Sequence, residues 1–394
     1  MPLESRPSLS RRQFIHTGSI ASIAALIGTH ARASSSPRIE VLQTKVISLD
    51  AEHYHGWPTV ARRRNGQLVL TYSGGREAHV CPFGRVEMMV SNDDGETWGW
   101  PRVLLDGDID DRDSGVLETS RGTLLATTFT SLAYEPILQA AEKIGAGAPN
   151  AWPAERLKFW KAAHNRLTPE QRKSQLGQWM IRSTDGGVTW SPPYSSIVNS
   201  PHGPVQLADG RLLYAGKELW TGDRRVGVCE SRDDGATWKW LAEIPVRAGD
   251  KASSYHELHA VEAGGRIIVQ IRNHNQPDAG ETLQTESEDG GTTWSPTHSI
   301  GVWGLPSHLL RLRNGDVLMT YGHRRAPFGN QARISRDAGR TWSELVVISG
   351  DGVGGDLGYP STVELADGTL LTVWYESMKG SHAVLRQAKW RMQA

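Results

Sequence analysis

Histidine, arginine, tyrosine and acidic residues stand at recurring places in this chain, immediately before or after short apolar segments. Arginine binds carboxylates in bidentate fashion, and histidine, tyrosine and carboxyl groups titrate, so such residues form ligand sites where they converge. One set precedes an apolar segment: His55-Gly-Trp-Pro58, Asp110-Asp-Arg-Asp113, His202-Gly-Pro204, His256-Glu-Leu-His259, Ser307-His308 and Tyr359-Pro360. The other set follows one: Arg76-Glu-Ala-His79, Lys217-Glu218, Arg272-Asn-His274, His323-Arg-Arg325 and Tyr375-Glu376.

Two repeated turns position these residues. The pattern Ser-x-Asp-x-Gly-x-Thr-Trp begins at Ser91, Ser183, Ser231, Ser287 and Ser335. Its Asp accepts backbone N–H groups, its Gly takes the positive φ of a bend, and we expect its Trp to be a buried anchor. The unit has too few carboxylates at ligand spacing for a calcium loop. A second turn, mostly Asn-Gly or Asp-Gly before an apolar strand, is a hairpin signal. It occurs at residues 65–70, 121–126, 209–214, 264–269, 314–319 and 367–372.

Each hairpin turn except the last is followed by one Ser-x-Asp turn, and such a pair joins four strands, which is the content of a propeller blade. The six units therefore predict an all-β chain, a six-bladed β-propeller of four-stranded antiparallel blades over residues 34–394. The interval from Ser91 to Ser183 is about one blade too long, which predicts a helical insert in blade two at about residues 131–178, with a capping box at Thr168-Pro-Glu-Gln171. Residues 39–49 are expected to close the ring as the outer strand of blade six. In this arrangement both sets of residues meet at one mouth of the central channel, which predicts a ligand site there.

The chain resembles the sialidase superfamily, six-bladed propellers whose Asp-box repeats are similar to the Ser-x-Asp turns. The resemblance covers nearly all of residues 40–394 apart from the insert. Residues 358–376, from Gly-Tyr-Pro-Ser to Tyr-Glu, are similar to the segment that carries the nucleophilic tyrosine. This implies that Tyr359 is the nucleophile and that Glu376 steadies an arginine of the carboxylate clamp.

Residues 256–273 resemble the segment that carries the glutamate partner of the tyrosine and the second clamp arginine. This implies those roles for Glu257 and Arg272, and Arg324 or Arg325 matches the third clamp arginine in placement. The implied activity is that of a retaining exo-glycosidase releasing a sialic-acid-like or other acidic sugar from a glycan. A neutral tyrosine avoids like-charge repulsion with the sugar carboxylate, and Glu257 would take the proton of the phenol, whose usual pKa is about 10. Four histidines are further substrate-binding candidates: His55, His202, His274 and His308.

Two features depart from the superfamily. His55-Gly-Trp-Pro58 stands where sialidases carry the first clamp arginine in an Arg-Ile-Pro-like motif. Arg76 or Arg112 could replace that arginine. No Asp lies between Arg76 and Ser91, where sialidases place the general acid. The remaining candidates for the acid are Glu77, His79, Asp111 and Asp113.

Two other functions stay open. The excess of histidine at the expected mouth favours a polysaccharide lyase acting on a uronate-containing polymer, with Tyr and His as base and acid. The missing acid and arginine favour a non-catalytic glycan-binding propeller. A metal site is not expected, because His256 and His259 are three residues apart on a strand and point to opposite faces. No cofactor is expected.

Lys and Arg together number 43, as do Asp and Glu, so the balanced charge gives no reason to expect a nucleic acid or an anionic membrane as partner. Cys81 and Cys229 are not expected to form the framework of the fold. Ser10-Arg-Arg-Gln-Phe-Ile15 resembles a twin-arginine export signal, followed by an apolar run and Ala31-Arg-Ala33. Residues 1–33 are therefore predicted to be a signal peptide recognised by the twin-arginine translocase. The apolar run is too short for a membrane anchor, and the mature chain is expected in the periplasm or outside the cell.

Overall fold

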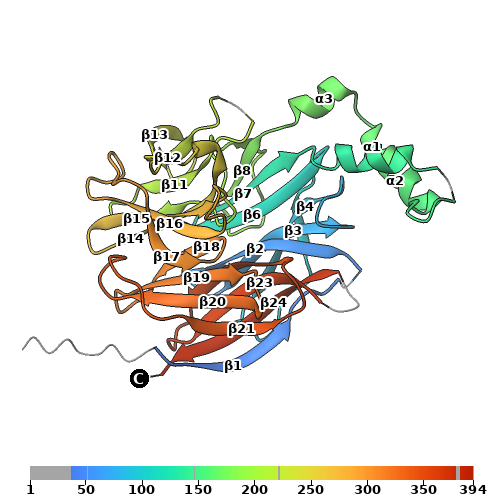
Figure 1. The fold of residues 1–394 in the computed structure, drawn as a ribbon. Helices are drawn as coiled ribbons and strands as arrows, with labels where there is room; N and C mark the ends of the chain where they lie inside the picture. Colours follow the sequence, from blue (N-terminus) through green and yellow to red (C-terminus); the bar gives the residue numbers. More distant parts are fainter. Residues whose placement is uncertain (1–36, 51, 146, 221, 379–381, 394) are drawn as a thin grey trace, which may run out of the picture. The chain divides into compact units, whose positions relative to one another are not determined.

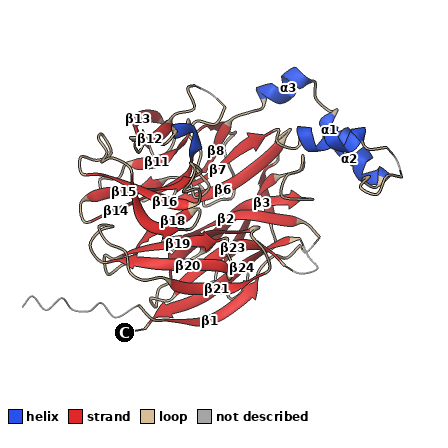
Figure 2. Cartoon of the chain, viewed as in Figure 1, coloured by secondary structure: helices blue, strands red, loops and turns tan. Residues whose placement is uncertain are grey.

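The computed structural model describes residues 37–50, 52–145, 147–220, 222–378 and 382–393. The signal peptide predicted at residues 1–33 lies outside the described residues and stays a prediction. The described chain forms six antiparallel sheets of four strands, each wound from the inside outward, which confirms the predicted six-bladed propeller (Figures 1 and 2). No helix within these residues is long and apolar enough to cross a membrane.

The strands follow the predicted units. Blade one consists of β2 (Tyr54–Arg62), β3 (Leu68–Arg76), β4 (Arg85–Ser91) and β5 (Arg102–Leu105). Blade two consists of β6 (Asp110–Glu118), β7 (Leu124–Ser131), β8 (Gln178–Ser183) and β9 (Tyr194–Ser195). Blade three consists of β10 (Val205–Gln206), β11 (Leu212–Lys217), β12 (Val226–Ser231) and β13 (Lys239–Glu243).

The second half continues the pattern, and a 3₁₀ turn (Ala252–Ser254) precedes blade four. Blade four consists of β14 (Tyr255–Ala263), β15 (Arg266–Asn273), β16 (Glu281–Ser287) and β17 (His298–Trp303). Blade five consists of β18 (Ser307–Arg311), β19 (Val317–His323), β20 (Phe328–Ser335) and β21 (Val346–Gly352). Blade six consists of β22 (Leu357–Glu364), β23 (Leu370–Ser377), β24 (Ala383–Met392) and β1 (Ile39–Val46).

The ring closes as predicted, because β1 pairs antiparallel with β24 and supplies the outer strand of blade six. The first strand of the fold thus lies beside the last (Figure 1). This pairing covers the ladder groups that β24 would otherwise expose at a sheet edge.

The Ser-x-Asp turns are structural, as their sequence indicates. In the copy at Ser183, the carboxylate of Asp185 accepts hydrogen bonds from the Ser183 hydroxyl and from the amide and hydroxyl of Thr189. The tryptophans of these turns are half-buried rather than buried, and each packs against a core cluster that includes residues of the preceding blade. For example, Trp98 of blade one donates to Gln387 of blade six, and Trp342 of blade five donates to Gln284 of blade four. The turns therefore join neighbouring blades as well as strands within a blade.

The helical insert lies between β7 and β8 and contains α1 (Glu135–Lys143), α2 (Ala154–His164) and α3 (Pro169–Ser174). The capping box predicted at the start of α3 is present, since Thr168 and Gln171 exchange side-chain and backbone hydrogen bonds. The insert has its own small core around Tyr134, Leu138 and Trp160, which also includes Cys81 from the loop after β3. Cys81 and Cys229 are both buried and free.

Candidate active site

Four inner strands carry the same irregularity at the same point. In β2, β6, β14 and β22, two residues of the inner strand face a single residue of the next strand, which is a β-bulge. The first residue of each bulge has a left-handed backbone although it is not glycine. These residues are Trp57 (φ 55°), Asp113 (φ 54°), Glu257 (φ 46°) and Tyr359 (φ 53°). Such backbone strain costs about 1–3 kcal/mol per residue and concentrates at functional sites, so the bulges mark the candidate site.

Tyr359 and Glu257 form the centre of this site. The Tyr359 hydroxyl donates a 2.5 Å hydrogen bond to Glu257 Oε1. Arg272 Nη1, from the end of β15, donates to Glu257 Oε2 at 2.5 Å and to the Tyr359 oxygen at 3.1 Å. Burial, reinforced by the Glu257 carboxylate, raises the pKa of Tyr359 well above its usual value. Burial alone would raise the pKa of Glu257, but Arg272 and the tyrosine hydrogen bond hold it below its usual value. The resting pair is therefore a neutral phenol on a charged base.

A second layer orients Tyr359. The guanidinium of Arg324, which follows β19, lies over the Tyr359 ring at 5.6 Å from its centroid and donates to the Leu357 carbonyl oxygen at 2.9 Å. Tyr375 accepts a 3.4 Å contact from Arg324 and donates to Asp356 at 3.1 Å. Arg324 is therefore the member of the predicted Arg324–Arg325 pair that faces Tyr359, and Arg325 is exposed and stacks on Trp303 at 3.7 Å.

Asp113 is the carboxyl group that blade two places at its bulge, in the position that Tyr359 and Glu257 occupy in their blades. Its residue is 6% exposed, and burial, together with the charge of Glu257, raises its pKa to about 7. Arg112, Arg76 and Arg272 oppose this shift without cancelling it. Asp113 also contributes to the raised pKa of Tyr359, so its charge lies within electrostatic reach of the pair. A carboxyl group with this pKa can hold a proton near neutral pH, as a general acid must.

The side of the site formed by blades three and four is cationic. The His256 and His274 rings lie 4.7 Å apart. Burial and the charge of Lys217 lower the pKa of His256 to about 4, and burial and Arg272 lower that of His274. Burial lowers the pKa of Lys217 itself to about 8. Lys217 therefore adds a positive charge to those of Arg272 and Arg324 while both histidines stay neutral.

Trp57 occupies the bulge of blade one, next to the position expected for a clamp arginine. Its indole is 2% exposed and meets the Tyr359 ring edge-on, with ring centroids 6.4 Å apart. The guanidiniums of Arg112 and Arg76 lie over the indole at 4.6 and 4.9 Å. Arg76 is fully buried and makes a bidentate pair with Asp110, at 2.7 and 3.1 Å. Arg76 thus cannot reach a substrate, and Arg112, also paired with Asp110 at 3.6 Å, supports the indole.

Two expected site residues, Glu77 and Glu376, have other partners. Glu77 accepts a 2.5 Å hydrogen bond from Trp160 and pairs with Arg156, so it anchors the insert and is not a free acid beside Tyr359. Glu376 accepts from Arg386 and Trp374, each at 2.6 Å, which corrects the expectation that it steadies a clamp arginine. With tryptophan in blade one, Glu376 instead pairs with an arginine on the neighbouring strand.

His79 lies nearer the centre. Its ring meets Trp57 edge-on at 5.1 Å, and its Nδ1 lies 2.8 Å from the Tyr54 hydroxyl and 3.0 Å from Asp356. The side chain is partly exposed. His79 therefore belongs to the rim of the site through Asp356, which also holds Tyr375.

Of the four histidines expected to bind substrate, His274 lies on the cationic side beside His256, and the other three lie elsewhere. His55 is 1% exposed and packs edge-on against Tyr72 inside blade one. His202 and His308 meet His259 inside the central channel, with ring centroids 4.6–5.3 Å apart. They line a pocket toward the other opening of the channel, formed by the far ends of the inner strands. The expectation that His55, His202 and His308 bind substrate at the mouth is thus corrected.

Asp356 and Lys217 complete the site; the sequence predicted Lys217 near the mouth without a role and did not predict Asp356. Asp356 stands three residues before Tyr359, as Asp110 stands three before Asp113, so the repeat phase carried a signal for it. Lys217 was noted at a strand end, but the charge that it places beside His256 depends on the curvature of two blades. Among the described residues, no group of three or more His, Cys, Asp or Glu side chains could hold a metal ion.

Comparisons with known proteins agree with this fold. The chain matches the family described as BNR repeat-like domain over residues 127–372. A xyloglucanase from a Paenibacillus species is 30% identical over 163 residues, which cover 39% of this chain and 15% of that protein. A sialidase from Micromonospora viridifaciens is 23% identical over 209 residues, which cover 43% of this chain and 29% of that protein. The chain therefore spans less than a third of either curated relative.

Solved structures give the same result. A protein of unknown function from Dyadobacter fermentans superposes with a TM-score of 0.72 at 22% identity, covering 90% of this chain and 99% of that one. The NanB sialidase from Streptococcus pneumoniae superposes with a TM-score of 0.61 at 15% identity, covering 89% and 70%. At these identities the likeness concerns the fold.

Proposed function

The chain belongs to the BNR repeat-like domain family, and from that premise we propose that it is a retaining glycoside hydrolase whose nucleophile is Tyr359. The observation that carries the proposal is the 2.5 Å hydrogen bond from the Tyr359 hydroxyl to Glu257 Oε1. Arg272 donates to the other carboxylate oxygen of Glu257 and to the Tyr359 oxygen. A phenol whose pKa is raised by burial is a poor nucleophile unless a base takes its proton. Glu257, whose pKa is lowered, is such a base at hydrogen-bond distance.

The reaction then has two balanced steps. In the first, the Tyr359 oxygen attacks the anomeric carbon, its proton passes to Glu257, and the bond to the leaving-group oxygen breaks as Asp113 donates a proton to that oxygen. In the second, the Asp113 carboxylate takes a proton from water, the hydroxide displaces the tyrosine oxygen, and Glu257 returns the proton to Tyr359. Two displacements at one carbon retain its configuration.

The charges beside Tyr359 favour a sugar that carries a carboxylate. Arg272 and Arg324 both face the phenol, and Lys217 adds a third positive charge on the side of blades three and four. Two guanidiniums can hold one carboxylate in bidentate fashion. Trp57 closes the side where blade one would add another arginine, so the carboxylate is expected between blades four and five rather than on the side of blade one.

The lyase hypothesis relied on many histidines at the mouth. His202, His259 and His308 lie together in the channel instead, and His55 packs inside blade one. This arrangement supports the hydrolase over the lyase.

A panel of aryl glycosides of acidic sugars, followed by proton NMR of the first-released sugar, tests the proposal. The wild-type protein is expected to release the sugar with retained anomeric configuration. Tyr359→Phe is expected to release no sugar. An inverted product would contradict the mechanism, and a product absorbing near 235 nm, as unsaturated uronates do, would identify a lyase.

A further inference from the structure

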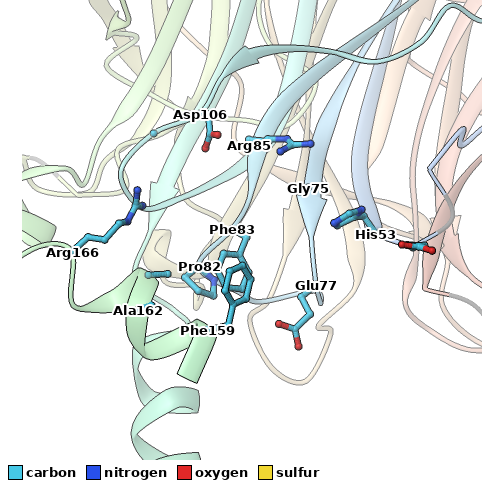
Figure 3. Close-up of a pocket in the computed structure, with 13 residues that line it drawn as sticks. His53, Gly75, Glu77, Pro82, Phe83, Arg85, Asp106, Phe159, Ala162 and Arg166 are labelled. Atoms are coloured by element: carbon cyan, nitrogen blue, oxygen red, sulfur yellow. The ribbon is translucent and has the colours of Figure 1, made fainter. Parts of the chain in front are cut away.

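The helical insert and blade one enclose a second groove, outside the Tyr359 centre, with a volume of about 700 Å³. This is within the range of roughly 300–1,000 Å³ typical of small-molecule sites. Its walls are the loop before β2, the end of β3 and one face of α2 (Figure 3). The mechanism proposed above uses none of the residues that line it.

One face of α2 is built for this groove. Phe159, Ala162, Ala163 and Arg166 follow the i, i+3, i+4, i+7 spacing that places side chains on one side of a helix, with Arg166 just beyond the helix end. Trp160, on a different side of the helix, is fully buried in the core of the insert. The two alanines leave space where longer side chains would fill the groove.

The wall of the groove contains an aromatic platform. Phe159 is 60% exposed, and its ring stacks on Phe83 with centroids 4.4 Å apart and planes inclined by 21°. Figure 3 shows both rings beside the open space, with Glu77 on the same side. An exposed aromatic ring supported from behind presents a flat apolar face, to which the C–H face of a pyranose ring is complementary.

The polar groups around the platform are mixed in charge. Figure 3 shows Asp106 between Arg166 and Arg85 on one side of the groove, and Glu77 on the other side beside the aromatic rings; Arg85 pairs with Glu87 at 2.7 Å. Such a rim offers both donors and acceptors to hydroxyl groups. It contrasts with the cationic surroundings of Tyr359 and fits a neutral sugar better than an acidic one.

Two short segments of chain run from the walls of the groove to the rim of the candidate active site. His53, on one wall, precedes Tyr54, whose hydroxyl contacts His79 and Asp356. Glu77, on another wall, stands two residues before His79, which meets Trp57. The groove thus adjoins the rim residues Tyr54 and His79.

We propose that this groove binds the neutral sugars on the leaving-group side of the glycan, with the Phe159–Phe83 pair as the stacking platform. The inference rests on the proposed function for its choice of ligand. The insert then holds the leaving-group part of the substrate, while the terminal sugar is bound at Tyr359.

Binding of neutral oligosaccharides to the Tyr359→Phe protein tests the inference without requiring catalysis. Lacto-N-tetraose, cellotetraose and xyloglucan heptasaccharide are titrated by isothermal calorimetry. At least one is expected to bind, and Phe159→Ala in the same background is expected to weaken it about five- to tenfold. Ala162→Trp, which fills the groove from an exposed position, is expected to abolish binding, whereas the matched Lys158→Trp on the same helix is not.

Unchanged affinity in both Phe159→Ala and Ala162→Trp would overturn the inference, as would a lack of binding by all three sugars. Melting temperatures identify any variant that fails to fold. Phe159→Ala removes side-chain volume from the groove and Ala162→Trp adds it, so the two variants test the same site by opposite changes. The proposed function fails on a different result, which is hydrolysis by Tyr359→Phe.

Discussion

Asp113 and Tyr359 occupy the same position in two different inner strands, as the first residue of a β-bulge, with φ angles of 54° and 53°. The bulge turns each side chain out of the regular alternation of its strand and toward the channel mouth. Glu257 occupies the same position in blade four. The propeller thus presents a carboxyl group, a base and a phenol from three blades through one repeated backbone device.

Tyr359→Phe is expected to lower kcat by about 10³-fold or more, because it removes the oxygen that attacks the substrate. The phenyl ring keeps the contacts with Trp57 and Tyr375, so the melting temperature should change little. Rates on an aryl glycoside of an acidic sugar and circular dichroism of the same samples measure both effects.

Tyr375→Phe is the matched control, since Tyr375 is equally buried, 5.8 Å from Tyr359, and bonded to Asp356 instead of Glu257. Loss of the Tyr375 hydroxyl should lower kcat about tenfold at most, which corresponds to one hydrogen bond. Equal losses in the two variants would exclude Tyr359 as the nucleophile.

The pH dependence of kcat/KM should report Asp113. Since burial raises its pKa to about 7, the acid is protonated below that pH, and the rate should fall tenfold per pH unit above it. The lowered pKa of Glu257 places the acidic limb below the usual range of glutamate. A profile from pH 2.5 to 9 measures both limbs.

Asp113→Asn should remove the alkaline limb and slow poor leaving groups by about 10²–10⁴-fold, but good leaving groups much less. Asp111→Asn, two residues away and bonded to the Gly107 amide, controls for loss of a buried carboxyl group. An unchanged alkaline limb in Asp113→Asn would assign the acid to another group.

The repeat phase alone was sufficient to bring Tyr359, Glu257, Arg272 and Arg324 to one place, because in a propeller every inner strand starts at the same mouth. The same phase placed β1 beside β24. What it could not supply was the direction of each side chain, which the bulges change. His202 and His308 stand near the same strand ends, yet they lie within the channel and meet His259 there.

Contacts between parts of the chain distant in the sequence were equally out of reach. Glu77 was a candidate acid because it follows β3, but Trp160 and Arg156 of the insert bind it. Glu376 was a candidate clamp partner, but the register of β23 and β24 brings Arg386 to it. Both depend on packing that no local pattern encodes.

Asp113 should also make stability depend on pH. Its pKa is raised to about 7 in the folded protein and is near 3.8 when unfolded. Between these values the folded state binds a proton that the unfolded state has released, so the free energy of unfolding falls as pH rises through this window and levels off above pH 7. The full effect is roughly 4 kcal/mol at most.

Urea unfolding at pH 4.5 and pH 8 measures this dependence. Asp113→Asn cannot ionise, so its stability should differ less between the two pH values, and at pH 8 the variant should be the more stable protein. A variant that loses stability equally at both pH values would show that Asp113 is charged throughout.

Arg272→Lys is expected to lower kcat/KM at least about 30-fold, because the single ammonium of Lys cannot both replace the Nη1 contacts with Glu257 and Tyr359 and offer a planar fork to a substrate carboxylate. The loss should include kcat, since Arg272 orients the pair that reacts. Arg325→Lys is the matched control, because Arg325 is exposed and stacks on Trp303 away from the pair. Steady-state kinetics of both variants on one substrate decide, and equal effects would remove Arg272 from the reaction centre.

Glu77→Gln should loosen the insert without affecting the blades. Gln can still accept the hydrogen bond from Trp160, but it loses the charge pair with Arg156, which also stacks on Trp152. Because the Glu77 side chain is partly exposed, the expected cost is about 1–2 kcal/mol, less than for a fully buried pair. Amide hydrogen exchange followed by mass spectrometry should show protection lost by roughly tenfold in α1 and α2, with β3 and β7 unchanged.

Glu155→Gln, which removes an exposed carboxylate from α2, is the control and should leave the exchange of α2 unchanged. If Glu77→Gln instead accelerated exchange throughout blade one, the carboxylate would be a support of the propeller itself rather than the anchor of the insert.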